Sequence, residues 1–508
     1  MTPRSQSVAL SASTHNELRH HLQREDGQED LCFALWYPSE GRTRTTALVA
    51  KAILPKHGER RVHGNASFLP HYFERALAEA LAANAGLAFL HSHPASGWQG
   101  MSSDDVRAEE GHAAAALAMT GLPLLGMTLG ATDGAWSARF WEKVAQRRYA
   151  CRPCSHVRVL GEALSVTYHD SLLKPPHLKP ELHRTVSAWG EQMQANLARL
   201  HVGVVGAGSV GAIVAEALAR SGIRRITIID FDSVQSVNLD RLLHATRRDA
   251  HLQKAKVSML ARALRQSATA DDFTANEVEY SVCEEEGFRA ALDCDVLFSC
   301  VDRPWPRAVL NLIAYAHLIP VVDGGIRVGV NRNGTLRRAD WKVQIASPGR
   351  RCLECLEQYN AADVSLEREG YFDNPSYING LPDDHPVRRN ENVFAFSLSA
   401  ASFEILQMLT MVIAPCGISN AGEQMYHFVP GLLDPPSFGV CKGTCIYPPL
   451  IANGDRAGIR VTGRHLAAEA VRAHRTQMIK NRNWRDVLAE YLYALGDRLR
   501  SDARSQSE

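Results

Sequence analysis

The chain has 508 residues, with 56 Lys and Arg against 55 Asp and Glu and a formal net charge of +1 at pH 7. This length predicts about two to four domains, and the balanced charge gives no support for a nucleic acid or a membrane surface as a partner. The 11 cysteines lie singly or in close pairs, which favours metal sites in a reducing cytoplasm over a disulfide framework. The longest uncharged stretch, Ala113 to Thr132, is broken by glycines and a proline, so we expect no membrane span there.

Residues 1–148 alternate helical and strand patterns and are expected to form a first α/β domain. The expected helices are Ser13–Arg24, Leu69–Ala83 and Ser102–Met119, and the expected strands are Leu31–Tyr37, Thr45–Leu54, Leu87–Leu90, Leu122–Met127 and Trp136–Trp141.

Three potential metal ligands follow the Leu87–Leu90 strand. His91 and His93 are two residues apart, so on an extended chain both side chains point to the same face. Asp105, near the start of the next helix, can supply an oxygen ligand. Two histidines and a carboxylate with an open position are the composition of a catalytic zinc site. Alternatively, Ser102-x-x-Asp105 is only a helix cap and the histidines form a polar rim.

Together, His-x-His-Pro and Ser-x-x-Asp resemble the JAMM motif of the JAB/MPN metallopeptidase family, whose domain has a cytidine-deaminase-like α/β fold. The resemblance implies that His91, His93 and Asp105 hold zinc and that Ser102 steadies the tetrahedral intermediate. It also implies a glutamate general base early in the domain, for which Glu29 is better placed than Glu25.

Residues 149–183 are expected to be a linker. Val157–Tyr168 alternates like a pair of strands, and Lys174–Pro180 is rich in proline and therefore stiff. Cys151 and Cys154 form a lone Cys-x-x-Cys pair, which is either a metal or redox pair or simply incidental.

Residues 184–453 are expected to form a second, nucleotide-binding domain. His201–Val205 is a short apolar strand, a turn with glycines at 206, 208 and 211 follows, and Ile226–Asp230 is a second buried strand ending on an acid. In this βαβ pattern the glycines let the backbone approach phosphate, a helix N-terminus faces the anion, and Asp230 can bind a ribose.

Further charged residues favour ATP over a dinucleotide cofactor. Asp232, Asn238, Arg241 and Lys254 follow Asp230, and Asp302 ends a later buried strand at the edge where such sheets bind ligands. Cleavage between the α- and β-phosphates requires cations to neutralise developing charge and an acid to hold Mg²⁺.

This half resembles the ThiF/ubiquitin-activating superfamily, which adenylates the C-terminal glycine of a ubiquitin-like protein. The resemblance implies a Rossmann-like fold in which Asp230 binds the ribose, Asn238, Arg241 and Lys254 bind the phosphates, and Asp302 holds magnesium. The glycines Gly206, Gly208 and Gly211 and the acid Asp232 complete the implied ATP site. Arg184 matches an arginine that reaches into the partner subunit's site, which implies a homodimer.

Two cysteine pairs, Cys352/Cys355 and Cys441/Cys445, predict a structural four-cysteine zinc site. The polar loop 360–390 leads into an apolar helix at Phe394–Val412 and corresponds to the loop that carries the nucleophilic cysteine in thioester-forming relatives. No cysteine occurs between Cys355 and Cys416, so either no thioester forms or an unusual residue forms it.

Residues 454–508 are expected to be a helical extension, with helices at His465–Ile479 and Trp484–Leu499 whose charged face is solvated or docks a partner.

The combination resembles bacterial fusions of a JAB peptidase with a ubiquitin-activating module, some of which are linked to phage defence. It implies a cytoplasmic enzyme that adenylates a ubiquitin-like protein, trims or deconjugates the same class of substrate as an isopeptidase, and works with a conjugating enzyme. Two alternatives stay open: an adenylyltransferase for a sulfur-carrier protein, and a non-catalytic scaffold that binds a ubiquitin-like tail.

Overall fold

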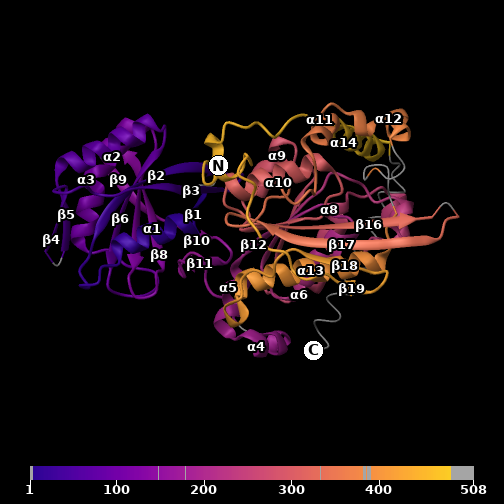
Figure 1. Ribbon diagram of the computed structural model, residues 1–508, viewed down its shortest axis with the longest axis horizontal. Coiled ribbons are helices and arrows are strands. Elements are labelled where there is room, and N and C mark those ends of the chain that lie inside the picture. Colours follow the sequence, from indigo (N-terminus) through magenta and orange to yellow (C-terminus); the bar gives the residue numbers. More distant parts are fainter. Residues whose placement is uncertain are drawn as a thin grey trace.

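The computed structural model describes residues 4–481, apart from residues 64, 147, 178, 332, 382–384 and 386–390. The chain folds around two large β-sheets, one formed by the N-terminal third and the other by the remainder (Figure 1). The expected helix at Trp484–Leu499 lies outside the described residues.

The first sheet has nine strands in the order β11-β10-β1-β3-β2-β6-β7-β8-β9. Its strands are β1 (Ser5–Ser11), β2 (Leu31–Glu40), β3 (Arg44–Ile53), β6 (Gly86–His93), β7 (Leu124–Gly130), β8 (Trp136–Ala145), β9 (Arg148–Pro153), β10 (His156–Leu160) and β11 (Leu164–Tyr168). The helices α1 (Ala12–Leu22), α2 (Pro70–Ala82) and α3 (Ser103–Thr120) accompany it, with a small hairpin of β4 (Arg60–His63) and β5 (Asn65–Phe68). All helices and strands expected between Ser13 and Trp141 are present.

The first sheet continues beyond residue 148, where the sequence placed the start of a linker. β9 pairs with β8, and β10 runs parallel to β1, so residues 148–168 complete this sheet. The expected strand pair at Val157–Tyr168 is confirmed as the antiparallel pair β10 and β11. The linker is therefore shorter than expected, because the polar side chains of His156 and Arg158 on β10 are buried against Asp295 of the second domain rather than solvated.

The second sheet has eight strands in the order β14-β13-β12-β15-β16-β17-β18-β19. Its strands are β12 (His201–Val205), β13 (Arg225–Ile229), β14 (Thr274–Val278), β15 (Val296–Ser299), β16 (Val321–Val330), β17 (Leu336–Ala346), β18 (Gln424–His427) and β19 (Leu432–Leu433). The strands from β14 to β16 are parallel, and the others are antiparallel. The chain order reverses between β12 and β15, which in Rossmann-like sheets opens a ligand crevice at the carboxyl ends of these strands.

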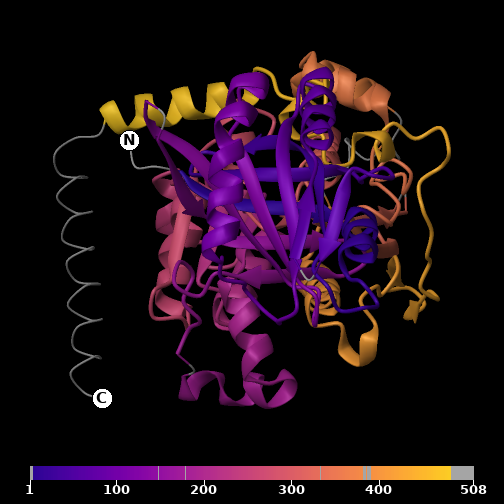
Figure 2. The same ribbon diagram turned by 90° about the vertical axis from the view of Figure 1, so that its left-hand side faces the viewer.

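Eleven described helices belong to this part of the chain. They are α4 (His183–Trp189), α5 (Glu191–Arg199), α6 (Ser209–Arg220), α7 (Arg247–His251), α8 (Lys256–Ser267), α9 (Glu285–Ala291), α10 (Pro304–Ala316), α11 (Ala361–Arg368), α12 (Pro375–Gly380), α13 (Phe394–Ile413) and α14 (Leu466–Lys480). α14 confirms the expected first helix of the C-terminal extension. It lies on one side of the molecule, whereas α4 and α5 project on the opposite side (Figure 2).

Among the described helices, α13 is the one long and apolar enough to cross a membrane by length and composition alone. It packs against α6, β16 and β17, and its Ala401, Met408 and Met411 belong to the core of the second sheet. This packing is that of a core helix.

Buried polar contacts join the two sheets. Asp295, which precedes β15, accepts hydrogen bonds from Arg44 of β3 (2.5 Å) and from Arg158 of β10 (2.9 Å). His156 Nε2 lies 3.1 Å from the same carboxylate, and the backbone amide of His201 donates to it at 2.9 Å. A buried charge is tolerated only when it is paired and hydrogen-bonded, and Asp295 meets this condition only with groups from both sheets.

Candidate functional site

The glycine turn after β12 lies at the crevice of the second sheet. Gly206 has a φ of 95°, and a Cβ there would lie 2.4 Å from the carbonyl oxygen of Cys300. A Cβ on Gly211 would lie 1.9 Å from the carbonyl oxygen of Gly206. Gly208, in contrast, has no atom within 4 Å of its Cβ position and stands at the N-cap of α6. Two glycines are thus required by close packing, and the third leaves space for an anion at a helix N-terminus.

Three carboxylates and one lysine meet beside this turn. Both carboxylate oxygens of Asp230 accept backbone hydrogen bonds, from Ala207 at 2.6 Å and from Asp232 at 2.7 Å. Lys256 Nζ lies 2.8 Å from the carboxylate of Asp232. Burial alone would lower the pKa of Lys256, but the carboxylates of Asp230, Asp232 and Asp302 outweigh it and raise the pKa. Lys256 is therefore a firmly charged cation at the edge of the crevice.

The structure identifies a second lysine, Lys256, beside the acids. The sequence assigned the phosphate role to Lys254, but the lysine whose charge acts on Asp230 is Lys256, the first residue of α8. The backbone of Lys254 joins the preceding loop, since its carbonyl accepts from Val234 at 2.8 Å and its amide donates to Asp249 at 3.0 Å. The two lysines are only two positions apart, and sequence alone gave no sign of where α8 begins.

The structure also describes the surroundings of three other expected residues. Asn238 Oδ1 accepts from the amide of Gln235 at 3.0 Å and so caps its own turn. Arg241 Nη1 donates to the carbonyl of Val237 at 2.7 Å and to Asp240 at 2.8 Å, also within the loop. Arg184 is exposed on α4. The structure thus brings together the glycine turn, Asp230, Asp232 and Asp302, while the described contacts of Asn238 and Arg241 stay within their loop.

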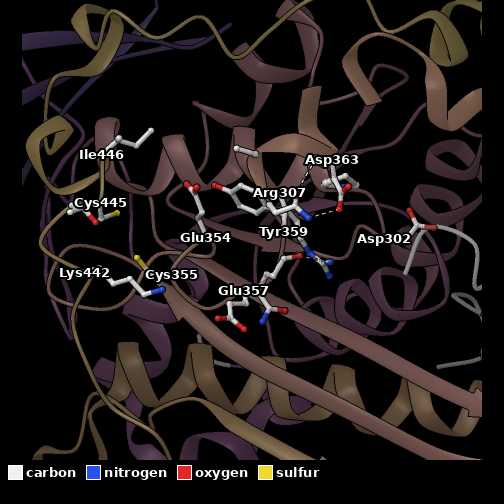
Figure 3. A pocket seen from close by; sticks show the side chains of 15 residues that line it. Asp302, Arg307, Glu354, Cys355, Glu357, Tyr359, Asp363, Lys442, Cys445 and Ile446 are labelled. Carbon is white, nitrogen blue, oxygen red and sulfur yellow. Dashed lines mark hydrogen bonds between the residues drawn. The ribbon is translucent and has the colours of Figure 1, made fainter. Parts of the chain in front are cut away.

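A pocket of about 510 Å³ extends from Asp302 to the second cysteine pair (Figure 3). Its charged lining comprises four carboxylates and two cations, namely Asp302, Glu354, Glu357, Asp363, Arg307 and Lys442. Arg307 is held in place because it donates to Asp323 at 3.2 Å and to the carbonyl of Gly324 at 3.1 Å. The pocket is therefore mainly acidic and opens directly beside the proposed magnesium acid.

The four cysteines of the second domain form one cluster. Cys352, Cys355, Cys441 and Cys445 offer sulfur atoms that all lie within 4.8 Å of one another. The Sγ atoms of Cys352 and Cys445 are 3.6 Å apart, and the amide of Cys352 donates to the sulfur of Cys441 at 3.2 Å. Tetrahedral zinc with bonds of about 2.3 Å places its sulfur ligands about 3.8 Å apart. The four residues therefore fit a structural zinc ion, despite the extra residue in the second pair.

The residues of the HxHP and SxxD motifs also form a cluster, at the carboxyl end of β6 and the start of α3. His91 Nε2 and His93 Nε2 are 3.2 Å apart, and they lie 3.6 Å and 3.4 Å from the carboxylate oxygens of Asp105. Tetrahedral zinc with bonds of about 2.0–2.1 Å requires ligand atoms about 3.4 Å apart. Three donor atoms at these separations fit one metal ion and leave one coordination position for a further ligand.

The charges around this cluster suit ligation. Burial, with a contribution from Arg139, lowers the pKa of His91 to about 3, so its ring is neutral, and its buried Nδ1 has no hydrogen-bond partner. Burial opposes ionisation of Asp105, but its hydrogen bonds with His93 and with the backbone and side chain of Ser102 lower its pKa below the usual range. A neutral imidazole and an ionised carboxylate are the forms that bind metal.

Ser102 and Glu29 border this cluster. Ser102 is the N-cap of α3: its Oγ accepts from the amide of Asp105 at 3.1 Å, and its amide donates to the Asp105 carboxylate at 2.7 Å. The capping and metal-binding interpretations of Asp105 are therefore both compatible with the structure. Burial raises the pKa of Glu29, while the charges of His93 and Asp105 act on it in opposite directions, which places Glu29 beside the cluster.

We expect the purified chain to bind two zinc ions, one at each cluster. His91→Ala and Cys352→Ser should each reduce the zinc content to one ion per chain, and the double variant should bind none. Plasma mass spectrometry of dialysed protein measures this directly. Retention of two ions by either single variant would show that the affected cluster is not a zinc site.

The ThiF family model matches residues 181–428. Residues 181–428 are a ThiF-family domain. The tRNA threonylcarbamoyladenosine dehydratase of Escherichia coli is 35% identical over 149 residues, which are 28% of this chain and 52% of that protein. The ubiquitin-like modifier-activating enzyme 5 of Drosophila willistoni is 27% identical over 187 residues, covering 33% of this chain and 43% of that protein. The chain thus spans about half the length of the curated relatives that it matches.

Among solved structures, E. coli MccB with ATP aligns with 53% of this chain and 74% of its own, at 17% identity and a TM-score of 0.41. The family match ends within the second sheet and begins just before α4, so it leaves the first sheet outside the ThiF domain.

Proposed function

We propose that this chain adenylates the carboxyl-terminal glycine of a ubiquitin-like protein with ATP and Mg²⁺. The observation that carries the proposal is the meeting of Asp230, Asp232, Lys256 and Asp302 beside an open glycine turn, within a ThiF-family domain. In this reaction a carboxylate oxygen attacks the α-phosphorus, the bond to the β-phosphate breaks, and pyrophosphate leaves.

Each residue of the cluster has a task in that reaction. The backbone amides at Gly208 and at the N-terminus of α6 would donate hydrogen bonds to the phosphates, and Asp230 would bind the ribose hydroxyls. Lys256 offsets the negative charge that develops on the pyrophosphate, and Asp302 holds the magnesium ion. Asn238 and Arg241 would turn from their loop toward the phosphates when ATP binds.

The acidic pocket is the proposed entrance for the substrate tail. It begins beside Asp302, and its excess of carboxylates over cations favours a tail that carries Lys or Arg.

Arg184 would complete the site of a second subunit, so we propose a homodimer. Because the loop before α13 offers no cysteine, we propose that the adenylate passes directly to a separate acceptor such as a conjugating enzyme. A thiol-sensitive adduct on this chain in a non-reducing gel would overturn that step.

For the first sheet we propose a JAMM-type peptidase that trims or removes the same class of ubiquitin-like protein. The support is the ligand spacing of His91, His93 and Asp105 together with Glu29 beside them. A zinc ion there would supply Lewis-acid activation of water. Glu29 would accept the proton at its carboxylate and return it to the leaving amine, and the hydroxyl of Ser102 would donate a hydrogen bond to the developing oxyanion.

The test of the adenylation proposal is exchange of labelled pyrophosphate into ATP. Exchange should require a ubiquitin-like protein with a C-terminal glycine, and Asp302→Ala should abolish it while leaving zinc content and tail cleavage unchanged. Two further assays replace the ubiquitin-like protein with a sulfur-carrier protein, the alternative left open by the sequence, and with threonylcarbamoyl-modified tRNA, which the name of one similar protein suggests. If only one of these two substrates drives exchange, that substrate takes the place of the ubiquitin-like protein in the proposal. If no substrate drives exchange, the result favours the non-catalytic scaffold.

A further inference from the structure

A cavity of about 900 Å³ lies where the two sheets meet, and both sheets contribute to its lining. From the first sheet come residues of β1, β3 and β10, such as Gln6, Arg44 and His156. From the second come residues at the amino ends of its parallel strands, such as His201 and Arg225. The nucleotide cluster lies at the carboxyl ends of the same strands. The cavity is therefore at the opposite edge of the sheet from the nucleotide site.

The charge of this cavity is predominantly positive. Seven arginine and lysine residues line it against three carboxylates, Glu142, Asp272 and Asp295. Five of the seven cations have carboxylate partners, including Arg44 with Asp295 and Arg224 with Asp272. The other two, Lys174 and Arg225, are exposed at the rim and have no carboxylate partner within the described part of the chain.

A buried group in the cavity wall also lacks a partner. Arg44 is 5% exposed, and its Nη atoms are held by Asp295 at 2.5 Å and by the carbonyl of Cys294 at 2.5 Å. Its Nε is buried and has no hydrogen-bond partner. A buried donor without a partner costs stability, so such a group in a cavity wall is a place where a ligand can complete the bonding.

We propose that this cavity binds a small anion with several phosphate or carboxylate groups, held between the two sheets. Guanidinium groups pair with both kinds of anion in fork geometry, and the volume is that of a small-molecule pocket. The formal net charge of +1 gives the whole molecule no general attraction for a long polyanion. This site is independent of the adenylation and peptidase sites, and a bound anion would stabilise the junction between them.

The test is calorimetric titration of the full chain with sodium tripolyphosphate, in the Lys256→Ala background so that the nucleotide site does not contribute. We expect one tripolyphosphate per chain. The double substitution Lys174→Gln/Arg225→Gln should weaken binding at least tenfold. The matched control Lys56→Gln/Arg61→Gln removes the same charge from exposed positions of the first domain and should leave the affinity unchanged.

Two further arms define the ligand. Sodium citrate in place of tripolyphosphate shows whether carboxylate or phosphate groups are preferred, and the tighter of the two identifies the class. Absence of binding by both anions, or equal affinity in the two double variants, would overturn the proposal. Binding of a single-stranded oligonucleotide alone through Lys174 and Arg225 would also overturn it, in favour of a nucleic-acid surface.

Discussion

Lys256→Ala is expected to reduce pyrophosphate exchange by about 10²-fold or more, because it removes the cation that offsets charge on the leaving pyrophosphate. Lys256 is held against Asp232 at 2.8 Å, and its charge is maintained by three carboxylates. Removing one side chain that stabilises charge developing in the transition state of a buried site typically reduces the rate by about this factor.

Lys254→Ala is the matched control, since it removes the same charge two residues earlier in the chain. Exchange by this variant should remain within about threefold of the wild type, because the lysine that contacts Asp232 and acts on Asp230 is Lys256. If Lys254→Ala loses exchange and Lys256→Ala retains it, the assignment from sequence was right and the structural assignment is wrong.

Glu29→Gln is expected to reduce cleavage of a ubiquitin-like tail by about 10²-fold or more, because glutamine cannot accept a proton. Burial raises the pKa of Glu29 above its ordinary value. Activity should therefore fall as the pH decreases through that raised pKa, where the carboxylate becomes protonated. Initial cleavage rates between pH 4 and pH 9 measure both effects, and zinc content should not change.

Glu25→Gln is the matched control for this prediction, because Glu25 is the other early glutamate and is exposed. Its cleavage rate should equal that of the wild type. A normal rate for Glu29→Gln would remove Glu29 from the role of general base, and a loss in Glu25→Gln would transfer the role to Glu25.

The parts of the fold that follow from local pattern could be predicted. The strand, glycine turn and helix from His201 to Arg220 are encoded within some 20 consecutive residues, and the structure has them as β12 and α6. The closeness of His91 and His93 was predictable for the same reason, because alternation along a strand places both side chains on one face.

The parts that depend on distant partners could not be predicted. β1 is an interior strand of the first sheet, but its sequence, Ser-Gln-Ser-Val-Ala-Leu-Ser, has only three consecutive apolar residues. Its polar Ser7 is buried because it meets Thr46 of β3 at 2.9 Å, a contact that no local pattern indicates. The strand β10 fell within the expected linker, and no local pattern shows that its Arg158 and His156 are buried around Asp295, more than 130 positions away.

The two lysines Lys254 and Lys256 show how far a sequence can predict the residues of a site. Residue type and approximate spacing located a lysine near the acids, but the contact of Lys256, the first residue of α8, with Asp232 is visible only in the structure. Asn238 and Arg241 were found by resemblance alone, and their described contacts keep them within their own loop.

We propose that this chain activates a carboxylate by cleaving ATP between its α- and β-phosphates. Incubation of the purified chain with Mg²⁺, labelled ATP and a ubiquitin-like protein with a C-terminal glycine, followed by separation of the nucleotide products, tests this. We expect AMP and pyrophosphate, reversed by added pyrophosphate and lost in Lys256→Ala and Asp302→Ala. Formation of ADP and phosphate instead, unchanged in both variants, would contradict it.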